Sequence, residues 1–436
     1  MPTDWIRRAG DALYGLTWAG ALIAGSPYLA GRAVLRPREM RERFAGWEEI
    51  PDEAIGGTWV HASSLGELRG ALNLLRALSA EGERSALTVM TPAARAAAAE
   101  ARRAGAALVR HVPLDFPPFV RRAARRLRPR ALLICETEIW PALLGEARRR
   151  RIPTAFVSAR LTARGAARLG RVRPYIGRLL REGIHVAAQS ERDAGRWRRL
   201  GVPAARLSVT GNLKYEAPAG PASPAERTER RRGWRRVVVL GSVRSGDADA
   251  VADAVARLGG LSGSVLFVLA PRHPARAGAW IERIGRLFDS VSERTQKEDA
   301  LVPAPGEELR GLLVVRTIGE LREFYRIADI GFVGATFCPI GGHNLFEVAE
   351  LGVPVVYGPH IEHVADVAEA LETEGGGWRA GDPAGLAAAM RAWLEQPEER
   401  ARAAAGALRA AERLAGAGGR TVCALRAWGF PLRGGA

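Results

Sequence analysis

Short apolar runs alternate with helical stretches along most of the chain, in two successive series. Strands that alternate with helices in this way form a parallel sheet with helices on both faces. The sequence therefore predicts an α/β protein with two Rossmann-like, doubly wound domains. The first series reads TWVHAS, ALTVM, ALVRHV, ALLIC, TAFVS, IHVAA and LSVTG, and the second reads RVVVLGS, SVLFVLA, GLLVVR, DIGFVGA and VPVVYG.

The domain boundaries follow from where this alternation stops. Residues 216–235 interrupt it with Pro, Ala and charged residues, which is typical of a linker. We expect a membrane-anchor segment at 1–44, a first domain at 45–215, the linker at 216–235 and a second domain at 236–436. Ligands of such sheets bind at the carboxyl ends of the strands, so the two domains are expected to face a cleft that holds the substrate.

Residues 12–31 carry no charged side chain, and this length is sufficient to cross a bilayer. Two arginines precede the segment and five follow it, which predicts that the body of the protein lies on the cytoplasmic face of the membrane. A buried helix, or a helix that lies in the membrane interface, is the alternative. The flanking arginines are Arg7 and Arg8 on one side and Arg32, Arg36, Arg38, Arg41 and Arg43 on the other.

The formal net charge of +17 comes almost entirely from arginine, because Lys214 and Lys297 are the only lysines. Residues 147–181 hold eleven arginines and no acidic residue, which favours an anionic partner such as anionic lipid, nucleic acid or a phosphorylated substrate. Few aromatic residues lie among them, which weakens the nucleic-acid alternative. The three scattered cysteines indicate no disulfide framework or zinc site.

The stretch HASSLGE places a carboxylate, Glu67, just after the first apolar strand. One interpretation is a helix cap, with Ser64 at the N-cap and Glu67 three residues later. The other is a catalytic group at the carboxyl end of the sheet, where Gly66 lets a substrate approach the backbone closely. The sequence alone leaves both open.

Further polar residues follow other strands of the first series. Glu136 and Glu138 come after ALLIC, and Ser158 and Arg160 end or follow TAFVS. Lys214 follows Gly211 and Asn212 at the end of the series, so one of the two lysines stands two residues from one of only three asparagines. This coincidence favours a specific polar role over a solvated loop.

The second series contains candidate anion-binding turns. The turn after Gly241 exposes backbone N–H groups near Arg244, and Arg272 and His273 follow the next strand. The segment GGHNLFE predicts a helix that runs to Gly352, with Asn344 capping it after the flexible Gly341 and Gly342. Glu347 in that helix either completes a capping box or accepts the hydroxyls of a ribose.

The order of HASSLGE, ETEIWP, SARLTAR, GNLKYE, APRHP, GGHNLFE and GPH resembles the 3-deoxy-D-manno-octulosonic acid (Kdo) transferases of lipopolysaccharide synthesis, over nearly the whole chain. The resemblance implies a GT-B fold and transfer of Kdo from CMP-Kdo to a lipid A precursor at the inner membrane. It also implies inversion at the anomeric carbon, with neither metal nor other cofactor and no nucleic-acid partner. It assigns the general base to Glu67 and donor contacts to Ser242, Arg272, Asn344 and Glu347, and it matches Lys214 to the lysine of the family's GNLK motif.

The sequence departs from the family pattern in three places. The turn after VLGS reads VRSGD where Thr-x-x-Gly-Glu is common, Ile361 follows GPH where the following residues usually include Asn, and Leu345 stands where Pro often follows the motif asparagine. Two alternatives therefore stay open. One is another GT-B nucleotide-sugar transferase or epimerase of cell-envelope synthesis, and the other is a non-enzymatic arginine-rich protein that binds anionic lipid or nucleic acid.

Overall fold

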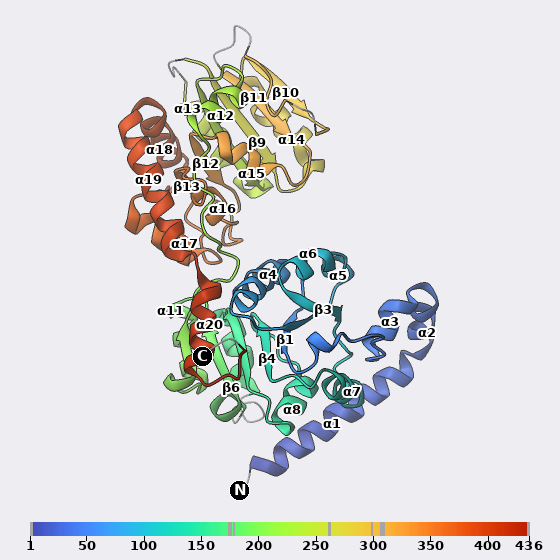
Figure 1. Ribbon diagram of the computed structural model, residues 1–436. Helices are drawn as coiled ribbons and strands as arrows, with labels where there is room; N and C mark the ends of the chain where they lie inside the picture. Colours follow the sequence, from blue (N-terminus) through green and yellow to red (C-terminus); the bar gives the residue numbers. More distant parts are fainter. Residues whose placement is uncertain are drawn as a thin grey trace. The chain divides into compact units, whose positions relative to one another are not determined.

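A computed structural model describes residues 3–172, 177, 179–259, 263–297, 300–305 and 310–433 (Figure 1). The chain forms two compact units, each described by itself. The first unit comprises Met1–Glu216 together with Gly416–Ala436, and the second comprises Ala217–Ala415.

The first unit contains a seven-stranded sheet in which every strand pairs in parallel, in the order β3-β2-β1-β4-β5-β6-β7. All seven apolar runs of the first series are strands, as predicted. Strands β1, β2, β4 and β5 are buried along their whole length, which is why they read as continuous apolar runs. The strands are β1 (Thr58–Ala62), β2 (Ser85–Val89), β3 (Ala106–His111), β4 (Ala131–Cys135), β5 (Thr154–Ala159), β6 (Ile184–Ala188) and β7 (Leu207–Val209).

Helices cover both faces of this sheet, and the two layers form separate clusters of buried side chains. One layer is built around Trp47, Trp59, Phe156 and Trp197, and the other around leucines of α4. The helices between the strands are α4 (Leu65–Ala80), α5 (Pro92–Ala96), α6 (Ala98–Arg103), α7 (Pro117–Leu127), α8 (Pro141–Arg149), α9 (Ala163–Arg171) and α11 (Glu191–Leu200).

The second unit contains another parallel seven-stranded sheet, in the order β10-β11-β9-β8-β12-β13-β14. The five apolar runs of the second series are β8 (Arg236–Val243), β9 (Val265–Pro271), β11 (Arg310–Val315), β12 (Ile330–Val333) and β13 (Val355–Tyr357). The sequence did not predict β10 (Ser290–Arg294) or β14 (Gly377–Arg379). Both are edge strands with exposed residues, so neither carries a continuous apolar run.

Helices of the second unit include one within the predicted linker. Arg231 of α12 forms an ion pair with Asp329 at 3.0 Å and donates to the carbonyl oxygen of Ile327, so this segment is part of the packed unit rather than a free linker. The helices are α12 (Pro224–Arg231), α13 (Ala248–Arg257), α14 (Ala277–Ile284), α15 (Leu321–Ile327), α16 (Phe346–Ala349), α17 (Ala365–Glu374), α18 (Pro383–Glu395) and α19 (Pro397–Leu414).

The C-terminal segment corrects the predicted domain boundary. The second domain was expected to continue to residue 436, but α20 (Ala417–Ala427) packs against α4 in the first unit (Figure 1). Thr421 hydrogen-bonds with Thr210 at 3.0 Å, and Arg420 donates to the Thr210 carbonyl oxygen at 2.9 Å. The chain therefore passes between the units twice, near Glu216 and near Ala415.

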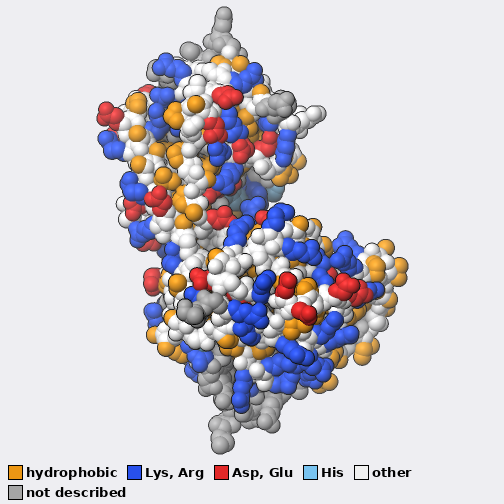
Figure 2. Space-filling model, viewed as in Figure 1, with side chains coloured by type: hydrophobic (Ala, Val, Ile, Leu, Met, Phe, Trp, Pro, Cys, Tyr) orange, Lys and Arg blue, Asp and Glu red, His pale blue; other side chains and the backbone are white. Residues whose placement is uncertain are grey.

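The N-terminal segment does not form one uninterrupted apolar helix. Helix α1 (Thr3–Ala24) ends inside the uncharged segment and α2 (Ser26–Leu35) begins after Gly25, with Pro27 in its first turn. Among the helices of the described residues, none combines the length and apolar character needed to cross a bilayer. Large apolar side chains nevertheless lie exposed on α1 and α2, and Figure 2 shows orange side chains at the right edge of the view, where Figure 1 draws α2. They are Leu16, Ile23, Tyr28, Val34 and Leu35.

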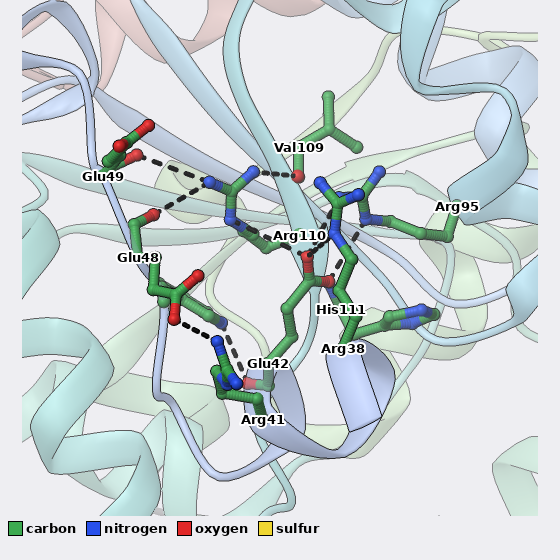
Figure 3. A network of polar contacts seen from close by, with 10 residues as sticks. Arg38, Arg41, Glu42, Glu48, Glu49, Arg95, Val109, Arg110 and His111 are labelled. Atoms are coloured by element: carbon green, nitrogen blue, oxygen red, sulfur yellow. Dashed lines mark hydrogen bonds and ion pairs between the residues drawn. The ribbon is translucent and has the colours of Figure 1, made fainter. Parts of the chain in front are cut away.

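A buried carboxylate fixes the following helix, α3 (Pro37–Arg43), to the first unit (Figure 3). Glu42 accepts two hydrogen bonds from Arg95, at 2.9 and 3.1 Å, and one from His111 N–H at 2.7 Å. These partners lower the pKa of Glu42 although burial opposes this. All five arginines that follow the uncharged segment lie within ion-pair distance of an acid, so part of the predicted positive flank is neutralised within the chain. The pairs are Arg32, Arg36 and Arg43 with Glu39, Arg38 with Glu42, and Arg41 with Glu48.

Candidate active site

In each sheet the strand order reverses between two central strands, and most of the predicted site residues follow the strands that meet there. In the first unit these strands are β1 and β4, and in the second they are β8 and β12. Such switch points open a crevice at the carboxyl ends of the strands, which is where open α/β sheets bind ligands.

Glu67 lies in the first turn of α4, directly after β1, and its side chain is 9% exposed. Its carboxylate accepts from Ser63 N–H at 2.8 Å and from the Ser64 hydroxyl at 2.9 Å. Burial and the charges of Glu138 and Glu136 raise the pKa of Glu67, although these two hydrogen bonds oppose the shift. Glu67 is therefore a more basic carboxylate than a solvated one.

Gly66 stands beside Glu67 in the same turn. A methyl group at its Cα would meet only Ser64 Oγ, at 3.7 Å, which is ordinary contact. Packing within the chain thus does not require glycine here, although glycine costs roughly 1 kcal/mol in a helix relative to alanine. The predicted close approach of a substrate would account for it.

Glu138 follows β4 and lies near Glu67. Its Oε2 accepts from Trp140 Nε1 at 2.7 Å and from the Ser63 hydroxyl. Burial favours the neutral form of Glu138, but these donors and the His61 ring outweigh it and lower the pKa of this carboxyl. The two acids therefore differ, with a raised pKa for Glu67 and a lowered pKa for Glu138.

Lys214 and Glu136 form a second polar pair in the first unit. Lys214 Nζ donates to Glu136 Oε1 at 2.6 Å, and Glu136 has a left-handed φ of +57°. Burial, together with the charges of Glu67 and Glu136, raises the pKa of the Cys135 thiol, and Lys214 acts in the opposite direction. All of these charges are therefore close to the end of β4.

Ser158 and Asn212 position the backbone around Lys214. The Ser158 hydroxyl accepts from Leu213 N–H at 3.1 Å, and Asn212 Oδ1 accepts from Lys214 N–H at 3.0 Å. Ser158 has a φ of +52°, a strained conformation that is characteristic of functional turns. Arg160 is half-buried two residues further on, and its carbonyl oxygen accepts from Thr137.

In the second unit, a carboxylate with no exposed surface holds the turns after β8 and β12 together. Asp247 accepts from Arg244 N–H at 2.8 Å, Ala335 N–H at 2.7 Å and Phe337 N–H at 3.0 Å. Ser242 and Ala335, which end or follow these strands, both have a left-handed φ, at +55° and +61°. The sequence showed Asp247 only as a departure from a family motif.

Arg244 is oriented by a neutral histidine. Its Nε donates to His343 Nε2 at 3.2 Å. Burial, with the charges of Arg244 and Arg272, lowers the pKa of His343 to about 4, so the ring is a neutral acceptor at pH 7. Arg272 and its neighbour His273 are exposed after β9.

The GGHNLFE segment differs from the prediction in one respect. The helix after it, α16, extends only over Phe346–Ala349, and its N-cap is Leu345 rather than Asn344. Asn344 is exposed, and its Oδ1 accepts from Phe346 N–H at 3.1 Å. Hydrogen-bonded turns continue after it to Gly352, where the N–H groups of Leu351 and Gly352 donate to carbonyl oxygens three residues earlier, and β13 begins at Val355. Glu347 is half-buried, and its charge contributes to the raised pKa of Tyr325.

Gly341 and Gly342 both need the left-handed region, with φ of +98° and +85°. A methyl group on Gly341 would approach the His363 ring to 3.0 Å, and one on Gly342 would approach Val364 to 2.8 Å. Glycine is thus required at both positions by the chain itself. Within the described residues, no group of three or more His, Cys, Asp and Glu side chains could hold a metal ion.

Comparison with known proteins decides the family. Residues 38–217 match the family model described as 3-deoxy-D-manno-octulosonic-acid transferase. The 3-deoxy-D-manno-octulosonic acid transferase of Bordetella pertussis is 33% identical over 399 residues, which cover 87% of this chain and 89% of that protein. The chain belongs to the Kdo transferase family. A second Kdo transferase, from Aquifex aeolicus, is 28% identical over 78% of this chain and 86% of its own.

Solved structures place this Kdo transferase family member among two-domain GT-B proteins. A glycosyltransferase from Rickettsia africae has a TM-score of 0.59 at 10% identity, and it covers 85% of this chain and 97% of its own. A UDP-GlcNAc 2-epimerase from Neisseria meningitidis has a TM-score of 0.56 at 10% identity, covering 85% and 99%. These likenesses show the fold, which transferases and epimerases share.

Several polar residues of the site were not singled out from the sequence. His61, Ser63 and Trp140 contact or approach the Glu138 carboxylate, and Gln189 donates to Ser158 at 2.9 and 3.0 Å. His61 and Ser63 belong to HASSLGE, and their position at the carboxyl end of a buried strand could have identified them as site residues. Gln189 follows β6 and could have been identified by its position in the same way.

Proposed function

We propose that this protein transfers Kdo from CMP-Kdo to a hydroxyl group of a lipid A precursor, with Glu67 as the general base. The observation that carries the proposal is the environment of Glu67. In a member of the Kdo transferase family, a nearly buried carboxylate stands at the switch point of the first sheet, is fixed by two donors and has a raised pKa.

The chemistry requires such a group. A sugar hydroxyl is a weak nucleophile, so a carboxylate within hydrogen-bond reach takes its proton as the hydroxyl oxygen attacks the anomeric carbon of Kdo. The bond from that carbon to the phosphate oxygen of CMP breaks with its electrons, and attack from the opposite face inverts the configuration. A raised pKa makes Glu67 a better acceptor for the proton.

The second unit supplies groups suited to the leaving nucleotide. Arg244 and Arg272 are cations that stabilise the negative charge developing on CMP without a metal ion. Asp247 and His343 fix the position of Arg244. We assign Ser242 and Asn344 to the nucleotide as well, and Glu347 to the hydroxyl groups of its ribose.

The N-terminal helices suit a membrane surface. The exposed apolar side chains of α1 and α2 would enter the interface of the inner membrane from its cytoplasmic face, with the chain lying on the bilayer rather than crossing it. An acceptor with acyl chains and phosphates would then be reached without leaving the bilayer. The surplus of arginine favours anionic lipid as the partner.

The test is product analysis by mass spectrometry with the purified full chain, CMP-Kdo and a lipid A precursor. We expect a Kdo-bearing product, with equal rates in the presence and absence of a metal chelator. Glu67→Gln should lower the rate by about 10²-fold to 10⁴-fold, the usual contribution of a general base, with CMP affinity unchanged. A rate within threefold of the native rate would rule out the base assignment.

A second arm tests the donor, because the fold is shared with a UDP-GlcNAc 2-epimerase. UDP-N-acetylglucosamine is offered in place of CMP-Kdo, with and without the lipid acceptor. Transfer or epimerisation of this sugar, with none from CMP-Kdo, would overturn the proposed function.

A further inference from the structure

A chain of hydrogen bonds runs under the proposed base at the carboxyl end of β1. Trp59 Nε1–H donates to Thr88 Oγ1 at 2.9 Å, and Thr88 Oγ1 lies 3.1 Å from His61 Nδ1. On the other side of the ring, His61 Nε2 lies 3.1 Å from Ser63 Oγ, and the Ser63 hydroxyl donates to Glu138 Oε2. The His61 side chain has no exposed surface, so water does not complete its hydrogen bonds.

The donors and acceptors of this chain fix its direction. The single hydroxyl proton of Ser63 is directed to the carboxylate of Glu138, so Ser63 Oγ can only accept from His61 Nε2. His61 must therefore carry a proton on Nε2. Thr88 Oγ1 accepts from Trp59 and has its own proton available for His61 Nδ1. The network thus assigns the neutral Nε2–H tautomer, which satisfies every group.

Ser63 joins this chain to Glu67. Its backbone N–H donates to Glu67 Oε2 at 2.8 Å, while its hydroxyl donates to Glu138 Oε2. One residue therefore donates to both carboxylates, through its backbone N–H to Glu67 and through its hydroxyl to Glu138. With Ser63 and Trp140 both donating to it, Glu138 is the acid of the pair that stays ionised.

We propose that His61 is a positioning residue: it directs the Ser63 hydroxyl onto Glu138 and so holds that carboxylate as an anion next to Glu67. The inference rests on the proposed role of Glu67 as general base. The negative charge on Glu138 makes a proton on Glu67 more favourable, so the base is stronger when the acceptor hydroxyl must be deprotonated. His61 itself touches no reacting atom in this scheme.

Other charges also act on the pair, and the test must take them into account. Glu136 adds to the negative potential at Glu67, its partner Lys214 opposes this, and Asp115 lies near His61. These groups stay unchanged in the variants below. The titratable groups around the pair are His61, Asp115, Cys135, Glu136 and Lys214.

The experiment is the pH dependence of kcat/KM for the full chain with CMP-Kdo and a lipid A precursor, in three variants. His61→Leu and Ser63→Ala weaken the support for the Glu138 anion, so Glu138 binds a proton at higher pH and places less negative charge beside Glu67. The acidic limb of the pH–rate profile, which reports Glu67, therefore moves down by roughly half a pH unit. Glu138→Gln removes the charge itself, so Glu67 becomes more acidic still and the limb moves down further. Downward shifts in all three variants, with the largest in Glu138→Gln, are the specific expectation.

A merely structural role of His61 gives a different result. It lowers the rate at all pH values and leaves the limb in place in both His61→Leu and Ser63→Ala, and this outcome would overturn the inference. An upward shift in Ser63→Ala or in Glu138→Gln would overturn it too. His61→Gln keeps a side-chain donor, and we expect it to return the limb toward the native position.

Two controls separate this inference from the proposed function and from misfolding. Glu67→Gln is assayed alongside, and if it stays active the proposed function fails, whatever the other variants do. If Glu67→Gln is inactive and the limbs of the other variants do not move, only the inference fails. Ser63→Ala removes one oxygen atom from a small side chain, so it decides the matter if His61→Leu does not fold.

Discussion

Ser64 and Glu67 hold each other at the start of α4 through a reciprocal pair of hydrogen bonds. The Ser64 hydroxyl donates to Glu67 Oε1 at 2.9 Å and accepts from Glu67 N–H at 3.2 Å. The helix-cap interpretation of HASSLGE is therefore confirmed. It also fixes the Glu67 carboxylate near Glu138, so a structural cap and the proposed base are compatible in one residue.

Replacing Ser64 should affect both roles. Ser64→Ala removes the cap, which lowers the free energy of unfolding by about 1 kcal/mol. It also removes a donor to the charged form of Glu67, so the pKa of Glu67 rises further and the acidic limb of the pH–rate profile moves up. Chemical unfolding and initial rates measure the two effects.

The matched control lies at the start of α11. Ser190 Oγ donates to Asp193 Oδ2 at 2.6 Å and accepts from Asp193 N–H at 3.2 Å, which repeats the same arrangement away from Glu67. Ser190→Ala should lower stability by a similar amount and leave the pH–rate profile in place. If both variants change the profile alike, Ser64 acts only through folding.

The two lysines should differ sharply. Lys214→Met breaks the 2.6 Å contact with Glu136 and leaves that carboxylate without this charged partner, so we expect the transfer rate to fall roughly tenfold or more. Lys297 is exposed, and Lys297→Met should leave the rate unchanged. Steady-state kinetics with CMP-Kdo and the lipid precursor compare them. Equal rates in both variants would contradict the role of Lys214.

Asp247 should be needed for the stability of the second unit. Asp247→Ala leaves three backbone N–H groups without their buried acceptor, and we expect the free energy of unfolding to fall by about 3 kcal/mol or more. CMP affinity should fall with it. Asp253 forms an exposed pair with Arg257, so Asp253→Ala should change stability by less than about 0.5 kcal/mol. Urea unfolding and calorimetry test both.

His343 should make the second unit less stable in mild acid. Its pKa is lowered to about 4 in the folded chain, while the unfolded chain has a histidine pKa near 6.5. The unfolded state therefore binds the proton first, so stability is complete above pH 6.5 and is lost as the pH falls toward 4. At pH 5 the loss is roughly 2 kcal/mol, and His343→Gln should abolish this part of the pH dependence. His273, which is exposed, is the control for the same substitution.

The apolar surface of α1 and α2 should bind membranes. Ile23 and Leu35 are 76% and 80% exposed, and the double variant Ile23→Glu/Leu35→Glu should lower affinity for anionic phospholipid vesicles by about tenfold or more. Ile318, which is 79% exposed in the second unit, provides the control Ile318→Glu. Vesicle sedimentation measures the difference. Equal binding by the two proteins would contradict the membrane role of these helices.

The sequence predicted the buried strands of both sheets, but it did not predict the edge strands of the second sheet. Twelve apolar runs became strands, because a strand covered on both faces must be apolar throughout. The edge strands β10 and β14 were not predicted, because Ser290–Arg294 alternates in exposure and Gly377–Arg379 is short. The anchor segment 1–44 was predicted from the uncharged stretch 12–31, but the division of that stretch at Gly25 depends on local backbone geometry.

The amino-acid sequence by itself determined the two parallel sheets, the strand ends at which polar residues collect, and the family. Tertiary structure alone decided which of these residues meet. Ser63 reaches both Glu67 and Glu138, Asp247 joins two turns about ninety residues apart, and the C-terminal helix returns to the first unit. The reason is physical: periodicity reports burial along one element, whereas a buried polar group must find partners on whichever element lies next to it.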